Sequence, residues 1–206
     1  MSSSSHEDRR RHPIGAVLAG GRSGRMGAPK AGVELGGRPL VAYSVETLVA
    51  AGLEPVVVAK PQSEIPHVDC PIVLDADPLP HPAAGILAAL RAGEGRPAVV
   101  VACDMPFVPP ALIAALAALD AHAAVPRVRG RMHPLLARYG PSVIPALEAA
   151  IEREAPLHEA VAALDPLVLG AGELARFGEP ERITFNVNDR DDLAAAERLV
   201  AVAPSR

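Results

Sequence analysis

Apolar residues along this chain fall into short unbroken runs that alternate with longer segments in which they recur at helical spacing. The runs Ile14–Leu18, Ile72–Leu74 and Ala98–Ala102, together with residues 55–59, contain almost only small and branched apolar side chains. Runs of this length and kind are typical of strands that are buried on both faces. The sequence therefore predicts four buried strands in its first half.

The segments between these runs show the pattern of helices. In residues 39–51 the apolar positions lie at helical spacing: Val41, Val45, Leu48 and Val49. Proline suits the first position of this helix, and Gly52 suits its end. Residues 84–92 and 110–119 are predicted to be helices for similar reasons, the latter with Leu112, Leu116 and Leu119 on one face.

The second half of the chain is less regular. Val125 and residues 134–139 are predicted to lie in strands, separated by a basic turn at residues 127–131. Residues 142–153 are predicted to form a helix and residues 183–187 a strand. Residues 191–202 are predicted to form an Ala-rich terminal helix, whose acidic first turn suits the helix dipole.

The alternation of strands and helices predicts an α/β protein with a three-layer, Rossmann-like fold and a mostly parallel central sheet. Ligands of such sheets bind beyond the carboxyl ends of the strands. That rule directs attention to residues 20–30, Asp75 and Asp104, each of which follows a predicted strand.

Composition narrows the possible functions. The 206 residues favour one domain, which we expect at residues 14–202, after a Ser- and Arg-rich disordered tail at residues 1–13. The scarcity of aromatic residues and the net charge of −4 disfavour nucleic-acid binding. Neither a signal-peptide pattern nor an apolar run long enough to span a membrane is present, so we expect a cytoplasmic protein. The cysteines, Cys70 and Cys103, do not form a disulfide framework and are expected to be small buried residues.

The loop at residues 18–30 combines four glycines with three cationic side chains, Arg22, Arg25 and Lys30. Glycines let a backbone approach a polyphosphate, and consecutive N–H groups can bind an anion. The loop is not a P-loop, because Lys30 is followed by Ala31 rather than Ser or Thr, and its glycine spacing is not that of a dinucleotide fingerprint. Its position after the first strand favours phosphate binding over a plain surface loop.

Asp104 follows the most apolar strand, within Cys103-Asp104-Met105-Pro106. Mg²⁺ in proteins commonly uses one or two carboxylates together with substrate phosphates, so a single Asp can suffice. On the residues alone, a metal ligand and a turn-capping residue are equally good interpretations of Asp104.

These motifs together resemble the molybdenum cofactor guanylyltransferases of the nucleotidyltransferase superfamily. The resemblance begins with Leu-Ala-Gly-Gly-Arg-Ser-Gly-Arg-Met-Gly-x-x-Lys at residues 18–30 and includes Asp75 ten residues before Gly85. It continues with the segment around Asp104, with Met-His-Pro-Leu at residues 132–135, and with Asn-Val-Asn at residues 186–188. It runs in order from about residue 14 to residue 200.

The resemblance implies a nucleotidyltransferase fold, transfer of GMP from GTP to the molybdenum-carrying molybdopterin, and release of pyrophosphate. It implies Mg²⁺ bound by Asp104, catalytic roles for Lys30, Asp104 and Arg25, and a nucleoside contact at Asp75. The residues implied to bind the substrates are Leu18, Ala19, Gly20, Gly21, Arg22, Lys30, Asp75, Gly85, Asp104, Asn186 and Asn188. The two asparagines are assigned to the pterin side. Molybdenum-insertion proteins and molybdoenzymes are the implied protein partners.

Two features depart from the family pattern. Pro29 precedes Lys30 where the guanylyltransferases often carry Asp, and His-Pro-Ala-Ala precedes Gly85 where Gly-Pro-Leu-Ala is more usual. They leave open transfer of CMP to the same pterin, or transfer to a sugar phosphate, while Leu-Ala-Gly-Gly and Asn-Val-Asn favour the guanine-using branch. A non-catalytic carrier of nucleotide or pterin is the alternative of another class, and the presence of both Lys30 and Asp104 argues against it. His133 is either an acceptor contact or a plain surface residue.

Overall fold

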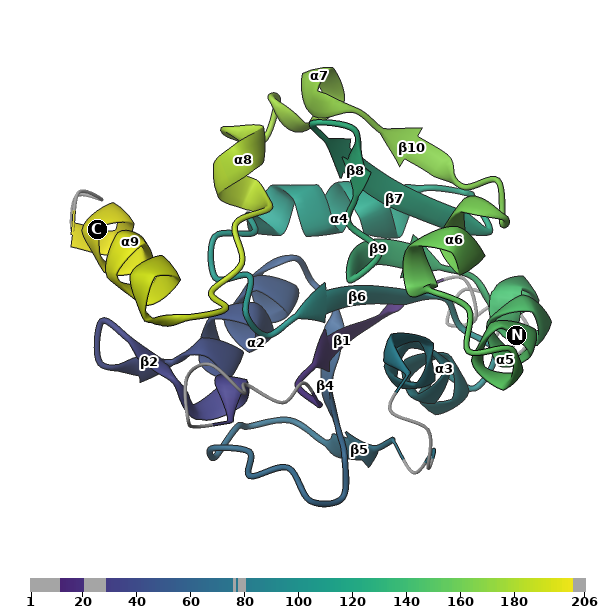
Figure 1. Cartoon of the computed structure of the whole chain (residues 1–206), viewed down its shortest axis with the longest axis horizontal. Coiled ribbons are helices and arrows are strands. Elements are labelled where there is room, and N and C mark those ends of the chain that lie inside the picture. The colour runs from purple at the N-terminus through teal and green to yellow at the C-terminus, as the bar shows by residue number, and fades with distance from the viewer. Residues whose placement is uncertain (1–11, 21–28, 76, 78–80, 202–206) are drawn as a thin grey trace, which may run out of the picture.

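A mixed sheet forms the centre of the molecule (Figure 1). The structure is a computed structural model and describes residues 12–20, 29–75, 77 and 81–201. Across the sheet the strands follow the order β10-β7-β9-β6-β1-β4-β5, and β8 pairs with β7. Their bounds are β1 Ile14–Leu18, β4 Glu54–Ala59, β5 Ile72–Leu74, β6 Ala98–Ala102, β7 Ala123–Val128, β8 Arg131–Met132, β9 Leu136–Tyr139 and β10 Leu167–Leu169.

The prediction of a mostly parallel sheet is confirmed. Strand β1 lies parallel to both β4 and β6, β5 continues parallel to β4, and β10 lies parallel to β7. Strand β9 is antiparallel to both of its neighbours, β6 and β7, and β8 is antiparallel to β7. The carboxyl ends of β6, β1, β4 and β5 therefore meet at one edge.

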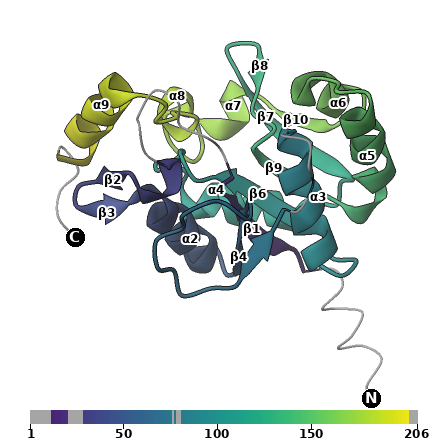
Figure 2. The same ribbon diagram turned by 60° about the horizontal axis from the view of Figure 1, so that its bottom comes forward.

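Helices cover both faces of the sheet, which confirms the three-layer architecture (Figures 1 and 2). One face is covered by α2 (Leu40–Ala50), α4 (Pro110–Ala118), α7 (Ala171–Leu174) and α8 (Pro180–Ile183). The other is covered by α3 (Pro82–Ala92), α5 (Ile144–Glu152) and α6 (Leu157–Ala162). The alternation in β6 shows the two cores, because Val99 and Val101 pack into the first and Ala98 and Val100 into the second.

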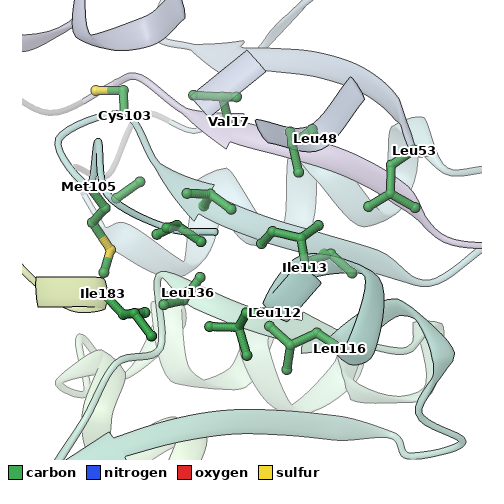
Figure 3. Packing of buried hydrophobic residues seen from close by; sticks show 14 of the residues in the cluster. Val17, Leu48, Leu53, Cys103, Met105, Leu112, Ile113, Leu116, Leu136 and Ile183 are labelled. Carbon is green, nitrogen blue, oxygen red and sulfur yellow. The ribbon is translucent and has the colours of Figure 1, made fainter. Parts of the chain in front are cut away.

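The first of these cores is built from branched aliphatic side chains. Figure 3 shows side chains of β1, α2, α4 and β9 gathered in this layer. Helix α2 approaches β1 closely at Gly15, where an added Cβ would lie only 2.9 Å from Leu48 Cδ2. The glycine in the first strand therefore allows close packing of helix on sheet.

A small satellite core lies beside the sheet. The hairpin of β2 (Glu34–Leu35) and β3 (Arg38–Pro39) turns at Gly36 and Gly37, which both have positive φ as a tight hairpin requires. The terminal helix α9 (Arg190–Ala201) packs against β2 (Figure 2). Val187 is fully buried between these elements, in a cluster that includes Leu35 and Ala196.

Most of the predicted elements are confirmed, but β5 is an edge strand with Ile72 49% and Leu74 57% exposed, so the prediction that it is buried is wrong. The predicted strand at residues 183–187 is also wrong. Ile183 ends helix α8, and residues 185–188 have no regular structure. Ile183 is buried in the first core, and Val187 is buried against α9 and the hairpin, so neither residue is buried by pairing in the sheet. In the part of the chain that the structure describes, no helix is long and apolar enough to cross a membrane.

Candidate active site

Four neighbouring strands end at the carboxyl edge of the sheet, and predicted site residues or charged residues follow each of them. Leu18 of β1 pairs with Ala102 of β6 and with Val58 of β4, so these strands end at the same level. Residues of the first loop follow β1, and Asp104 follows β6. Lys60 follows β4, and Asp75 follows β5. This is the edge at which parallel sheets bind ligands.

The structure brings together four predicted site residues, which we name the Lys–Asp–Asn cluster: Lys30, Asp104, Asn186 and Asn188. Lys30 Nζ donates to Asp104 Oδ2 at 2.6 Å and to Asn188 Oδ1 at 2.7 Å. Asn186 Nδ2 donates to the other carboxylate oxygen, Asp104 Oδ1, at 3.0 Å. Three distant parts of the sequence therefore meet at one carboxylate, and the Lys30 and Asp104 side chains are only 15% and 12% exposed.

Backbone contacts hold the asparagine segment against the strand end. The Val187 N–H donates to the Asp104 carbonyl at 2.8 Å, and the Asn188 N–H donates to Asp192 Oδ2 at 2.9 Å. Because Val187 is buried in the satellite core, its two neighbours are held at the site. The Asn-Val-Asn segment thus combines one packing residue with two polar residues.

Lys30 is positioned by a short 3-10 helix, η1 (Lys30–Gly32), which Pro29 precedes. The Gly32 N–H donates to the Pro29 carbonyl, and Ala31 is buried in the first core. Pro29, which departs from the family pattern, therefore occupies the cap of the turn that carries the lysine. Gly21, Arg22 and Arg25 of the predicted phosphate loop lie outside the described residues.

A second charged pair lies farther along the same edge. Asp75 is 7% exposed, and its Oδ2 atom lies 2.9 Å from Lys60 Nζ. The predicted contacts at the end of β1 lie between the Lys30–Asp104 pair and the Lys60–Asp75 pair. Ala19 is buried, and its N–H donates to the Val58 carbonyl at 2.8 Å. An added Cβ at Gly85 would lie 3.5 Å from the Leu18 side chain, so α3 packs on the end of β1.

A cavity of about 520 Å³ opens beside the Lys–Asp–Asn cluster. Its lining includes Asn186 and Met105, together with His133, Met132 and Leu157. Burial, followed by the charge of Arg131, lowers the pKa of His133 below its ordinary value. The imidazole is therefore neutral at pH 7 and can either donate or accept a hydrogen bond. Cys103 is an unreactive thiol, since burial raises its pKa to about 12.

Comparison with known proteins identifies the family. A family model described as a MobA-like NTP transferase domain matches residues 15–168. A molybdenum cofactor guanylyltransferase of Rhizobium johnstonii is 35% identical over 91% of this chain and 92% of its own. A probable molybdenum cofactor guanylyltransferase of Pyrococcus furiosus is 34% identical over 91% and 97%. The chain belongs to the molybdenum cofactor guanylyltransferase family.

Solved structures agree with this assignment. The molybdopterin-guanine dinucleotide biosynthesis protein A of Archaeoglobus fulgidus has a TM-score of 0.79 and 27% identity, and it covers 92% of this chain and all of its own. The 2-C-methyl-D-erythritol 4-phosphate cytidylyltransferase of Thermus thermophilus, at 21% identity and a TM-score of 0.65, shares the fold. The chain is thus a nucleotidyltransferase enzyme, and the predicted family and fold class are confirmed.

The Lys–Asp–Asn cluster offers one carboxylate, Asp104, to a metal ion. Among the described residues no group of three or more His, Cys, Asp or Glu side chains could hold a metal. Each Asp104 oxygen accepts one hydrogen bond and retains a lone pair, so one carboxylate together with substrate phosphates and waters is the donor set available. That set suits Mg²⁺, which keeps several waters and takes few protein ligands.

Two residues that are important in the structure, Lys60 and His81, were not predicted from the sequence. Lys60 could have been found because it comes at the carboxyl end of a predicted strand, as Asp75 and Asp104 do. His81, in the unusual His-Pro-Ala-Ala segment, caps α3 by accepting from the Ala83 N–H at Nδ1. Its Nε2 atom lies 2.7 Å from the Ala155 carbonyl, so the residue also ties α3 to the loop before α6.

Proposed function

We propose that this protein transfers GMP from GTP to the phosphate of molybdenum-carrying molybdopterin, forming molybdopterin guanine dinucleotide and releasing pyrophosphate. The Lys–Asp–Asn cluster is the observation that carries the proposal. It joins the loop after β1, the carboxylate after β6 and the Asn-Val-Asn segment in one hydrogen-bonded group. The names of the relatives favour guanine and molybdopterin as the two halves of the product.

In this proposal the nucleotide lies across the end of β1. The backbone at Leu18, Ala19, Gly20 and Gly21, with Gly85 beneath, accommodates GTP, and Asp75 faces the base. Lys30, Arg22 and Arg25 neutralise the phosphates, as a compact ammonium and two forked guanidinium groups can. Asn186 and Asn188 face the pterin side, where the cavity beside His133 receives the acceptor.

The chemistry needs no protein nucleophile. An oxygen of the acceptor phosphate forms a bond to the α-phosphorus of GTP, the bond from that phosphorus to the bridging oxygen breaks, and pyrophosphate leaves. Catalysis then depends on in-line placement of the two substrates and on neutralising negative charge around the α-phosphate. Asp104 would hold Mg²⁺, which supplies Lewis-acid polarisation of the phosphates when bound. The ammonium of Lys30, anchored by Asp104 and Asn188, is held at the same place.

The decisive experiment offers the purified protein each of the four α-labelled NTPs with molybdopterin, with and without Mg²⁺. We expect label from GTP alone to appear in a dinucleotide product, together with pyrophosphate. Incorporation of CTP in place of GTP would show a cytidylyltransferase, and transfer to a sugar phosphate would show a different acceptor. Tight GTP binding without any product would show a carrier.

Three broader assignments belong to the same proposal. Residues 14–202 act as one catalytic domain, with residues 1–13 as a tail. The enzyme works in the cytoplasm, where GTP is available. It passes its product on to molybdoenzymes and receives its acceptor from molybdenum-insertion proteins.

A further inference from the structure

An ion pair lies at the ends of β4 and β5, away from the Lys–Asp–Asn cluster. Lys60 Nζ lies 2.9 Å from Asp75 Oδ2 and donates to the Asp77 carbonyl at 2.8 Å. The Asp77 N–H donates to Asp75 Oδ1 at 3.1 Å. The Lys60 and Asp75 side chains are only 15% and 8% exposed. Both oxygens of the carboxylate are therefore held, and the carboxylate plane is fixed.

Lysine is rare in this protein, which makes the pair conspicuous. The chain contains 18 arginines but only two lysines, Lys30 and Lys60. Among the described residues, the exposed ion pairs to glutamate are made by arginine, for example Arg38–Glu46 and Arg91–Glu148, or by His158 with Glu159. Both lysines instead lie at the carboxyl edge of the sheet and pair with an aspartate that follows a strand. A compact ammonium with three donors suits these two enclosed positions.

The pair also lies where a nucleoside would extend from the phosphates. The strand order β6-β1-β4-β5 places Asp104, with its partner Lys30, on one side of the end of β1 and the Lys60–Asp75 pair on the other. Neighbouring strands are ~4.8 Å apart, so the two sides are separated by a few strand spacings, comparable to the length of a nucleoside. Gly20 of that loop packs on Lys60, since an added Cβ would lie 3.4 Å from Lys60 Cγ.

Building on the proposed function, we propose that Lys60 is a positioning residue that fixes the Asp75 carboxylate for selection of guanine. Guanine presents two adjacent donors on one edge, N1–H and the 2-amino group, and a carboxylate accepts from both. Adenine and cytosine present a ring-nitrogen acceptor at the equivalent place, which a carboxylate repels. Lys60 acts through Asp75, because its ammonium keeps the remaining lone pairs of that carboxylate directed at the base.

Kinetics with GTP and ITP test the proposal, because inosine lacks only the 2-amino group. Lys60→Met keeps the aliphatic stem against Gly20 and removes the charge. We expect it to raise KM for GTP about tenfold, the loss expected when one charged hydrogen bond is weakened, with kcat changed by less than about twofold. The preference for GTP over ITP should fall to that of Asp75→Asn, and Lys60→Arg should restore part of it.

An ion pair at the opposite end of β4 provides a matched control for Lys60→Met. Arg96 pairs with Glu54, the first residue of β4, at 2.8 Å. Arg96→Met removes an ion pair from β4 far from the proposed base site, so the preference for GTP over ITP should stay unchanged. A folded Lys60→Met variant that keeps the full preference for GTP overturns the proposal.

A second measurement uses the unaltered protein and does not depend on activity. Protein labelled with ¹³Cε-lysine gives two lysine side-chain NMR signals, which Lys60→Arg assigns. Pyrophosphate should shift the Lys30 signal, and GMP should shift the Lys60 signal more than IMP does. If pyrophosphate shifts Lys30 but GMP leaves Lys60 unmoved, this inference fails and the proposed function stands. If neither ligand shifts either signal, both fail.

Discussion

Asp104 connects the parts of the candidate site, because its two oxygens contact side chains from the first loop and from the Asn-Val-Asn segment. Replacement by Asn keeps the shape of the side chain but removes the charge that would hold Mg²⁺ and that balances Lys30. We expect Asp104→Asn to lower the rate of Mg²⁺-dependent pyrophosphate release by roughly 10²–10³-fold. A normal circular dichroism melt would show that the fold is retained. Undiminished pyrophosphate release in this variant would exclude Asp104 from the metal site.

A second prediction concerns Lys30, and it is about GTP affinity rather than the rate of turnover. Its ammonium lies 2.6–2.7 Å from two acceptors, Asp104 and Asn188, so it is already held where phosphates would bind. Lys30→Ala should weaken GTP affinity by about tenfold or more, measured by calorimetry, because a charge-assisted contact is lost. Lys30→Arg, which keeps the charge, should lose less. Equal GTP affinities for Lys30→Ala and the unaltered protein would count against the phosphate-binding role of the loop.

His133 gives a prediction about pH. Burial and Arg131 lower its pKa in the folded protein, whereas the unfolded chain has the ordinary value of about 6.5. The unfolded state therefore binds more protons in the interval below pH 6.5, and the free energy of unfolding must fall as the pH falls through it. In NMR titration the His133 ring should titrate below 6.5, and His133→Asn should remove its share of the acid destabilisation. A His133 pKa at or above 6.5 would contradict the enclosed position.

At the scale of elements, helix α9 and the β2–β3 hairpin position the Asn-Val-Asn segment by packing around Val187. They bury this residue completely, and its two neighbours then reach Asp104 and Lys30. The Asn-Val-Asn segment has no regular structure of its own, so its position depends on this packing. Elements outside the carboxyl edge of the sheet thus help to determine the geometry of the site, through the packing of Val187 and the Asn188–Asp192 hydrogen bond.

Truncation of the Val187 side chain should reduce both the stability and the activity of the protein. We expect Val187→Ala to lower the free energy of unfolding by about 1–3 kcal/mol, measured in urea, because it leaves a cavity in a closed core. The same substitution at Val49, which is 56% exposed, is the matched control and should change it by less than about 0.5 kcal/mol. Val187→Ala should also slow transfer, while Val49→Ala should not. Equal effects at the two positions would refute the anchoring role.

Element prediction succeeded where a periodic pattern was long enough to be read. Strands β1, β4, β5 and β6 and helices α2 and α4 follow directly from apolar runs and helical spacing. The β2–β3 hairpin and α7 were not predicted, because segments of two to four residues carry no period. Residues 183–187 carry apolar, branched side chains typical of a strand, but Ile183 is buried in the first core and Val187 by α9 and the hairpin, without sheet pairing.

At the scale of the whole molecule, the predicted site depends on contacts that no local pattern reveals. Lys30 and Asp104 could be selected because each follows a strand at the ligand-binding edge. The contact from Lys30 to Asn188 joins positions 158 residues apart, and only the family resemblance pointed to the asparagines. The position of Lys60 after a strand could be read from the sequence, but its partner, Asp75, follows the next strand, and their pairing requires the register of β4 with β5.

The same long-range connectivity predicts how GTP should affect unfolding. Lys30, Asp104 and Asn188 lie on segments from the beginning, middle and end of the chain, so a ligand bound among them opposes separation of all three. At a GTP concentration a hundred times its Kd, binding to the native state alone adds about 2.7 kcal/mol to the free energy of unfolding. For a chain of this length that corresponds to a rise in Tm of roughly 5–10 °C. Scanning calorimetry with Mg²⁺ and GTP should show one transition displaced as a whole, while CTP at the same concentration displaces it less and Lys30→Ala abolishes most of the shift. A split transition, in which only the first half of the chain is stabilised, would show that the Asn-Val-Asn segment takes no part in holding the nucleotide-bound state.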